Sequence, residues 1–231
     1  MATFSVVATP IGNLGDLSRR AVATLAAADL LLCEDTRVTK KLLSEYGLAT
    51  PTLSYHAHSP LGRESKIIQS LRDGRDVALV SDAGTPGISD PGAELVAHIR
   101  AELKDEISNG DVKIVAIPGP SALLAALSIA GVPCAQFTFF GFPPHKKGRQ
   151  TLFREIATAA RTAVFYESPH RIMKALESLA EYAPASKRLT VCRELTKVFE
   201  EIVQGTAAEV KHFFETHPDK IRGEFVVIVS S

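Results

Sequence analysis

Residues 81–92 read SDAGTPGISDPG, and this loop joins a short β-rich run, Val77–Val80, to a helical stretch. Its three glycines permit positive φ angles and a close approach of the backbone to a ligand. The prolines Pro86 and Pro91 stiffen the loop, so its amides lose little entropy on binding. Ligands of open α/β sheets bind at the carboxyl ends of strands, where this loop is expected to lie. We interpret it as a binding loop; the alternative is a connecting turn with helix-capping residues.

Short apolar runs alternate with helical stripes on both sides of this loop. The alternation predicts an α/β fold with a parallel sheet in the first half of the chain, and strands paired near the end predict a mixed sheet in the second half. The expected strands are 4–8, 29–33, 77–80, 112–117, 137–142, 163–166, 189–192, 199–203 and 225–229. The expected helices are 19–28, 36–46, 65–71, 95–107, 121–130, 150–160, 172–179 and one that begins at Thr206.

Helical order breaks at the Gly-Val-Pro stretch near 131–134. We therefore expect two α/β domains: residues 1–133, which carry the Gly/Pro-rich loops, and residues 134–231, which carry the mixed sheet.

Two further loops follow expected strands in the first domain. Residues 117–121 read IPGPS, and Pro120 suits the first position of a helix, so helix initiation alone would explain this loop. Residues 9–16 read TPIGNLGD, which matches neither the phosphate-binding pattern GxxxxGK[ST] nor the dinucleotide pattern GxGxxG. The two commonest nucleotide-binding loops are therefore not expected here.

The 231 residues include 26 basic and 26 acidic side chains, so the formal net charge is zero. A polyanion would have to bind through a local patch, and HKKGR at 145–149 is the candidate. The three isolated cysteines are expected to be reduced thiols in the core. No apolar run is long enough to span a membrane and no histidines have metal-ligand spacing, so we expect a cytoplasmic protein without a bound metal.

Charged residues recur at the ends of expected strands: EDTR at 34–37, YESPHR at 166–171, RE at 193–194 and RGE at 222–224. Such residues are more often helix caps or ion pairs than catalytic groups. Their shared position at strand ends makes each of them a candidate for the site.

Together these motifs resemble the ribosomal RNA small-subunit methyltransferase I family of the tetrapyrrole methylase superfamily. The resemblance runs in order over nearly the whole chain and rests on VATPIGNL (7–14), EDTR (34–37), SDAGTPGISDPG (81–92), PGPS (118–121), FYESPHR (165–171), RELTK (193–197) and GE (223–224). It implies two α/β domains with S-adenosylmethionine in the cleft between them, and a homodimer. It also implies 2'-O-methylation of a cytidine in the decoding region of 16S ribosomal RNA, as RNA or within the small ribosomal subunit.

Site residues follow from these motifs. For S-adenosylmethionine we expect contacts from Pro10, Asp82, Ala83, Gly84, Thr85, Pro86, Gly87, Pro118, Gly119, Pro120, Ser121, Tyr166 and Gly223. For RNA phosphates we expect Lys146, Lys147, Arg149 and Arg171. For the proton of the ribose hydroxyl we expect Glu167 as the base, with Glu34 and Asp35 as alternatives and Arg193 orienting the acid. A purely structural role for Glu167, as a cap or as a partner of Arg171, is equally compatible with the sequence.

Two other functions remain open at this level. A tetrapyrrole or diphthine-type methyltransferase on the same scaffold would keep the cofactor and lose the RNA. A non-catalytic RNA-binding or ribosome-assembly module would lose the cofactor, but the chain carries all the loops expected to bind it.

Overall fold

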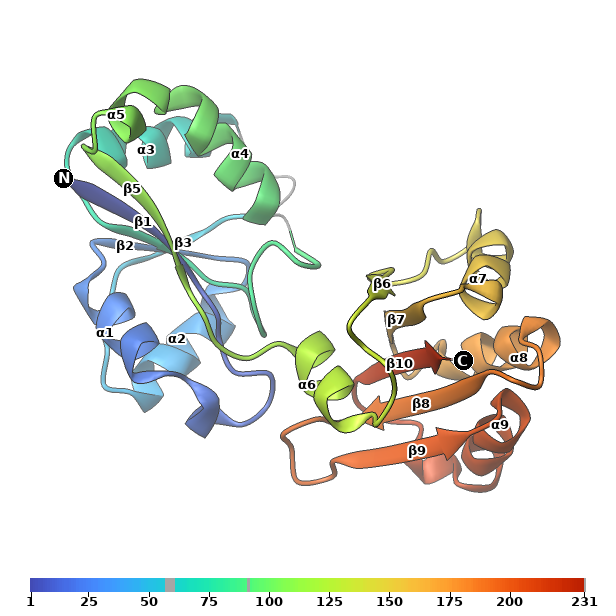
Figure 1. Ribbon diagram of the computed structural model, residues 1–231. Coiled ribbons are helices and arrows are strands. Elements are labelled where there is room, and N and C mark those ends of the chain that lie inside the picture. Colours follow the sequence, from blue (N-terminus) through green and yellow to red (C-terminus); the bar gives the residue numbers. More distant parts are fainter. Residues whose placement is uncertain (57–60, 91, 231) are drawn as a thin grey trace. The chain divides into compact units, whose positions relative to one another are not determined.

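The computed structural model describes residues 1–56, 61–90 and 92–230 (Figure 1). The chain divides into two compact units, Met1–Ser121 and Ala122–Ser231. The boundary expected from the sequence lies at residue 133. The second unit also takes in the helix α6 (Ala122–Ile129), because this helix packs on the last strand of that unit.

The first unit is a parallel sheet between two layers of helices. The strand order is β3-β2-β4-β1-β5, and every neighbouring pair is parallel. Its strands are β1 (Ala2–Val7), β2 (Leu30–Cys33), β3 (Thr52–Ser54), β4 (Val77–Leu79) and β5 (Val112–Ile117). Its helices are α1 (Arg19–Ala27), α2 (Thr36–Glu45), α3 (Leu61–Arg72), α4 (Gly92–Glu102) and α5 (Lys104–Ser108).

The side chains of β1 point to the two faces of the sheet in turn, and each face is covered by its own layer of helices. Phe4 packs with Ile67 of α3 and Leu95 of α4 in one buried cluster. Val7 packs with Leu25 of α1 and Leu43 of α2 in another. Because successive side chains of a strand point to opposite faces, both faces of this sheet are buried, as expected for parallel strands.

The second unit is a mixed sheet of order β6-β7-β10-β8-β9. Only β6 and β7 are parallel, and the other pairs are antiparallel. Its strands are β6 (Phe137–Phe139), β7 (Thr162–Glu167), β8 (Arg188–Arg193), β9 (Glu201–Gly205) and β10 (Phe225–Ser230). Its further helices are α7 (Arg149–Thr158), α8 (Ile172–Tyr182) and α9 (Ala207–Thr216), which begins with the capping box of Thr206 and Glu209.

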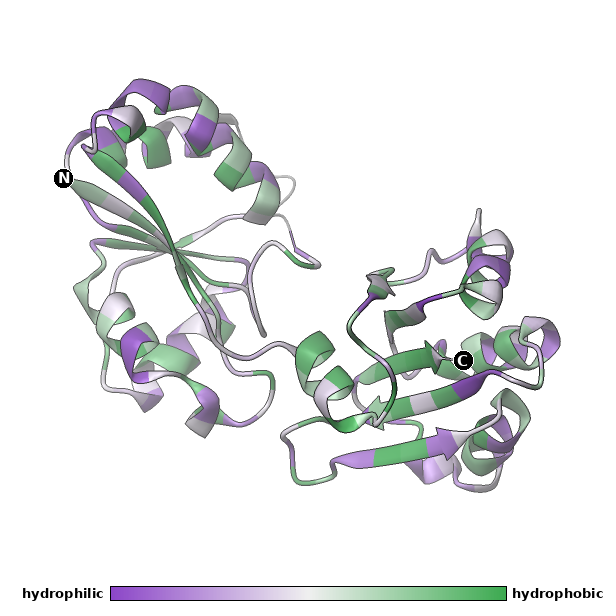
Figure 2. Cartoon of the chain, in the orientation of Figure 1, coloured by the Kyte–Doolittle hydropathy of each residue, from purple (hydrophilic) through white to green (hydrophobic). Residues whose placement is uncertain are grey.

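The central strand β10 is buried along its whole length and mostly apolar in Figure 2. Its residues Phe225, Val227 and Val229 join the core formed with α7, α8 and α9. The helix α6 packs on β10 as well. The predicted α/β class, with a parallel first sheet and a mixed second sheet, is confirmed.

Three expectations are corrected. The single helix expected over 95–107 is two helices, because Leu103 leaves the helical conformation with ψ of 29°. The strand β3 has no fully buried residue and gave no apolar signal in the sequence. Cys33 and Cys192 are buried thiols, but Cys134 is exposed and lies outside the core.

No helix in the described part of the chain is both long and apolar enough to cross a membrane. Within the same residues, no group of three or more His, Cys, Asp or Glu side chains is placed to hold a metal ion.

The turn after β8 has an unusual backbone. Glu194 and Thr196 have backbone φ angles of 53° and 66°, values that residues other than glycine rarely adopt. The backbone N–H of Glu194 donates to the carbonyl of Glu224 over 3.0 Å, and the N–H of Glu224 donates to the Glu194 carboxylate over 3.0 Å. Gly223 lies against this turn, and a Cβ there would be 2.2 Å from Cδ of Glu194. The φ of 79° favours glycine at position 223, and a side chain there would displace the Glu194 carboxylate from its hydrogen bonds with Lys197 and Glu224.

We expect Gly223→Ala to destabilise the second unit more than Gly131→Ala. Gly131 also has a positive φ, 65°, but a Cβ there would meet nothing within 4 Å, so its substitution reports the backbone strain alone. Strain of this kind costs about 1 kcal/mol, and the collision with Glu194 should at least roughly double the loss. Urea unfolding of the two variants measures the difference. Equal losses would show that Glu194 moves aside without cost.

Candidate functional site

Three loops meet at the carboxyl edge of the first sheet, where β4, β1 and β5 end side by side. The N–H of Thr9 donates to the carbonyl of Gly84 over 2.9 Å, and the N–H of Gly84 donates back over 3.1 Å. The hydroxyl of Thr85 donates to the carbonyl of Pro120 over 3.0 Å. The three loops singled out in the sequence are therefore hydrogen-bonded into one edge. Ligand binding by this edge stays a prediction.

The backbone approaches itself closely at this edge. A Cβ at Gly119 would lie 3.0 Å from Cβ of Ala8, so a larger residue there would require the third loop or the end of β1 to shift by a few tenths of an ångström. Gly84 and Gly87 have φ of 83° and 85°, which explains both glycines without a ligand. Contacts among the three loops themselves hold this edge of the sheet together, without help from a cofactor.

The predicted cofactor residues of the first unit differ in exposure. Pro10, Gly84 and Pro86 are buried and hold the loops in place. Asp82, Ala83, Pro118 and Gly119 are exposed, whereas Thr85, Gly87, Pro120 and Ser121 are half-buried. A ligand at this edge would therefore contact the four exposed residues, Asp82, Ala83, Pro118 and Gly119, first.

Carboxylates gather at the same edge. The Glu34 carboxylate makes no hydrogen bond or ion pair with any other residue of the ranges 1–56, 61–90 and 92–230. Its burial raises its pKa, and the negative charges of Asp82 and Asp90 raise that pKa further. Asp90 was not singled out in the sequence; its Oδ1 accepts from the N–H of Gly87 over 2.5 Å and so shapes the 81–92 loop.

Asp35, adjacent to Glu34, has a different role. It is the N-cap of α2, where its carboxylate accepts from the N–H of Arg37 over 2.8 Å and pairs with the Arg37 guanidinium over 2.6 Å. These bonds to Arg37 lower the pKa of Asp35 to about 2. A carboxylate engaged in this way is a poor proton acceptor near neutral pH.

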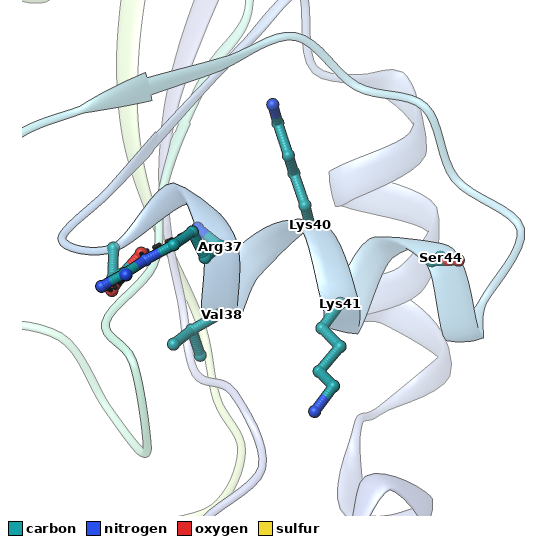
Figure 3. Close-up of a pocket in the computed structure, with 6 residues that line it drawn as sticks. Arg37, Val38, Lys40, Lys41 and Ser44 are labelled. Carbon is teal, nitrogen blue, oxygen red and sulfur yellow. Dashed lines mark hydrogen bonds and ion pairs between the residues drawn. The ribbon is translucent and has the colours of Figure 1, made fainter.

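The exposed side of α2 forms an open hollow lined by Asp35, Arg37, Val38, Lys40, Lys41 and Ser44 (Figure 3). The side chains of Lys40 and Lys41 point to opposite sides of the helix in this view. None of the Gly/Pro loops lines the hollow, so it does not mark the expected cofactor site.

In the second unit, Glu167 ends β7 as a fully buried carboxylate between two arginines. One oxygen accepts from Nη2 of Arg149 over 2.9 Å, and the other lies 2.9 Å from Nε of Arg171 and accepts from the N–H of Ser168 over 2.9 Å. Both oxygens are therefore occupied. This arrangement favours the structural role that the sequence left open over proton transfer; the assignment of Glu167 as a base has no geometric support here.

The two arginines also hold the loop before α7. Arg171 Nη1 donates to the carbonyl of Pro143 over 2.9 Å, and Arg149 Nη1 donates to the carbonyl of Pro144 over 3.3 Å. The Arg149 guanidinium stacks over the Phe153 ring, 4.7 Å from its centre. The buried carboxylate thus fixes the start of the loop through two guanidinium groups.

Lys146 and Lys147 follow in the same loop and are exposed. Neither side chain forms a hydrogen bond or an ion pair with another residue in the described part of the chain. The helix α7 then begins at Arg149, and its N-cap residue, Gly148, supplies no side-chain cap. Free lysines beside an uncapped helix N-terminus form a positive surface suited to phosphate.

The remaining predicted residues lie in the second unit. Arg193 is buried with its Nε 3.5 Å from Glu201, so its orienting role stays a prediction. The Tyr166 hydroxyl accepts from the N–H of Leu123 over 3.1 Å at the start of α6. Gly223 is explained by its contact with Glu194, and cofactor contacts from Tyr166 and Gly223 stay predictions.

Sequence reasoning overlooked Phe142. Phe142 is 54% exposed although it is aromatic, and its ring contacts the ring of Tyr166 edge to face, with centroids 5.4 Å apart. The aromatic run FTFFGF directly before PPHKK could have drawn attention to it, because interleaved aromatic and basic residues are typical of nucleic-acid-binding surfaces.

Comparison with known proteins gives the same assignment as the motifs. The family model for Tetrapyrrole (Corrin/Porphyrin) Methylases matches residues 3–211. The Ribosomal RNA small subunit methyltransferase I of Synechocystis sp. is 43% identical over all of this chain and 79% of its own length. The protein of the same name from Xylella fastidiosa is 44% identical over 98% of this chain and 81% of its own length.

Solved structures of low identity share the fold. The methyltransferase CobJ aligns with a TM-score of 0.66 and 20% identity, over all of this chain and 93% of its own. A uroporphyrin-III-C-methyltransferase from Thermus thermophilus aligns with a TM-score of 0.62 and 18% identity, over 99% of this chain and 94% of its own.

Enzymes of this family take their methyl group from S-adenosylmethionine. The loop edge of the first unit fits that cofactor chemically. It offers exposed backbone at Ala83 and Gly119, and the carboxylates of Glu34 and Asp82 suit the positive charge of a sulfonium. The whole-length identity and the matching motifs place the chain in the ribosomal RNA small subunit methyltransferase I family of S-adenosylmethionine-dependent tetrapyrrole methylases.

Proposed function

We propose that this enzyme methylates the ribose 2'-hydroxyl of a cytidine in the decoding region of 16S ribosomal RNA, as RNA or within the small ribosomal subunit. The observation that carries an RNA substrate is the loop held by Arg149 and Arg171. There, on a chain of zero net charge, Lys146 and Lys147 make no hydrogen bond or ion pair with another residue that the structure describes. The names of the relatives that match nearly all of this chain support it, and the cytidine and the 2'-oxygen come from the resemblance to their family. A homodimer in the cytoplasm belongs to the same proposal.

The chemistry asks two things of the protein. S-adenosylmethionine, when bound, supplies a methyl group that is attached to a sulfonium. When the methyl group is transferred, the sulfur leaves as a neutral thioether and needs no proton. The ribose hydroxyl is a weak nucleophile, so the protein must align it and accept its proton. Alignment alone can lower the barrier by roughly 7 to 11 kcal/mol. A proton acceptor adds about 10²- to 10⁴-fold in rate.

Glu34 is the carboxylate best suited to accept that proton. It lies at the loop edge of the first unit, and its carboxylate is free of hydrogen bonds and ion pairs in the described ranges. Its raised pKa brings it closer to the operating pH, where a general base is most effective. Asp35 caps α2 and Glu167 is bound to two arginines, so neither is available in the same way.

We assign Arg149, Arg171 and Glu167 to positioning and not to direct contact with the reacting atoms. Their side chains are 13%, 16% and 0% exposed, and each guanidinium already serves Glu167 and a proline carbonyl. Lys146 and Lys147 are left as the direct phosphate contacts.

Glu34→Gln should lower the single-turnover methylation rate at least roughly tenfold at saturating cofactor and RNA. The wild-type rate should rise with pH through a pKa above the ordinary 4.5 of a glutamate, because only the ionised carboxylate accepts the proton and burial raises its pKa. That rise should vanish in the variant. The exposed Glu45→Gln at the end of α2 is the matched control. A wild-type rate and pH profile in Glu34→Gln would contradict the role of Glu34.

Removing Lys146 and Lys147 together, each to Ala, should weaken RNA binding and flatten its dependence on salt. For single-stranded RNA, each lost phosphate contact reduces the slope of log K against log salt by about 0.7. The matched control is the other adjacent pair of exposed lysines, Lys40→Ala with Lys41→Ala on α2. Fluorescence anisotropy over a salt series measures both slopes. If the 146–147 variant keeps the wild-type slope, this loop does not contact RNA.

A further inference from the structure

We propose that Phe142 is a stacking platform for an unpaired base of the RNA whose phosphates contact Lys146 and Lys147. This inference rests on the proposed function and adds a second, uncharged mode of recognition to it. It identifies the bound nucleotide as unpaired, because a base within a helix has no free face to offer a side chain.

The ring of Phe142 is exposed but held in place. Phe142 is 54% exposed, and its ring packs edge to face on the ring of Tyr166, with centroids 5.4 Å apart. Tyr166 in turn packs on Phe139 with centroids 4.9 Å apart, and its hydroxyl accepts the N–H of Leu123. An exposed aromatic ring supported by other rings loses little freedom when a ligand stacks on it.

The backbone on either side of Phe142 is also fixed. The N–H of Tyr166 donates to the carbonyl of Gly141 over 2.9 Å. On the other side, the carbonyl of Pro143 accepts from Arg171, whose guanidinium is held by the buried Glu167. The fold therefore presents an apolar ring to solvent from a segment that it immobilises at both ends.

Charge identifies what would cover the ring. Lys146 lies four residues after Phe142, within about 14 Å along the chain, so both side chains can meet one short stretch of a strand. Lys146 and Lys147 have no partner in the described part of the protein, and α7 begins beside them without a side-chain cap. An aromatic face next to cations is the combination that single-stranded nucleic acid requires.

Phe199 shows that exposure alone does not give this combination. It is 70% exposed on the connection between β8 and β9, but Glu200 and Glu201 follow it directly in the sequence. Carboxylates there repel phosphate, and the nearby Lys197 is already paired with Glu194 and Glu224, so Phe199 has no unpaired cation beside it among the described residues. It is the matched control for Phe142 in the same unit.

The test measures the affinity of the whole 231-residue chain for a short unstructured oligoribonucleotide, and for the same oligoribonucleotide with its bases removed. Phe142→Ala should weaken binding of the intact RNA about tenfold, because the base loses its stacking partner. It should leave the salt slope unchanged, because the ring carries no charge. Phe142→Trp should bind at least as well as the wild type, and Phe199→Ala should bind like it.

Base removal separates stacking from a change in folding. The abasic RNA should bind the wild type and Phe142→Ala equally, because neither complex then contains the stack. Wild-type affinity of Phe142→Ala for the intact RNA, or an equal loss with the abasic RNA, overturns the inference while leaving the proposed function intact. A wild-type protein that neither binds nor methylates RNA overturns both.

Discussion

The buried carboxylate of Glu167 is the interaction on which the loop before α7 depends. A charge with no exposed surface is stable only when it is paired, and here two guanidinium groups and one backbone N–H supply the pairing. Removing one partner from such an ion pair costs about 3–5 kcal/mol, because the other charge is left buried alone. The end of β7, the starts of α7 and α8 and the loop at 143–148 are therefore fixed as one group.

Local charge differs between the two units, as the proposed binding of a cationic cofactor and of RNA by a chain of zero net charge would require. In the first unit, Glu34, Asp82 and Asp90 make the loop edge acidic, which suits a cationic cofactor. In the second unit, Lys146 and Lys147 make no hydrogen bond or ion pair with another described residue, and they lie beside a helix start without a side-chain cap, which suits a polyanion. Screening over about 8 Å at physiological salt makes such local surfaces more important than the total charge.

The sequence predicted what depends on local pattern and missed what depends on distant partners. Strand and helix alternation gave the two sheets, and the strand β5 has the predicted bounds, 112–117. Asp35 as a helix cap is local and could be read from its position before α2. By contrast, Glu167 meets Arg149 from 18 residues away, and Glu34 is perturbed by Asp82 and Asp90 from other strand ends. No spacing rule reveals such contacts before the fold is known.

One geometric rule explains why motifs scattered along the chain fall into two groups. In the first unit all strands are parallel, so the loops after β1, β2, β4 and β5 share one edge of the sheet. In the second unit the sheet is mixed, yet β7 and β8 both run antiparallel to β10 and so point the same way. Phe225 of β10 pairs with Glu167 on one side and with Arg193 on the other, which brings the motifs at 165–171 and 193–197 to one edge. The first residues of β10 meet that edge too, so the strained turn at Glu194 and the glycine at 223 lie beside the Glu167 group because of strand direction, not sequence proximity.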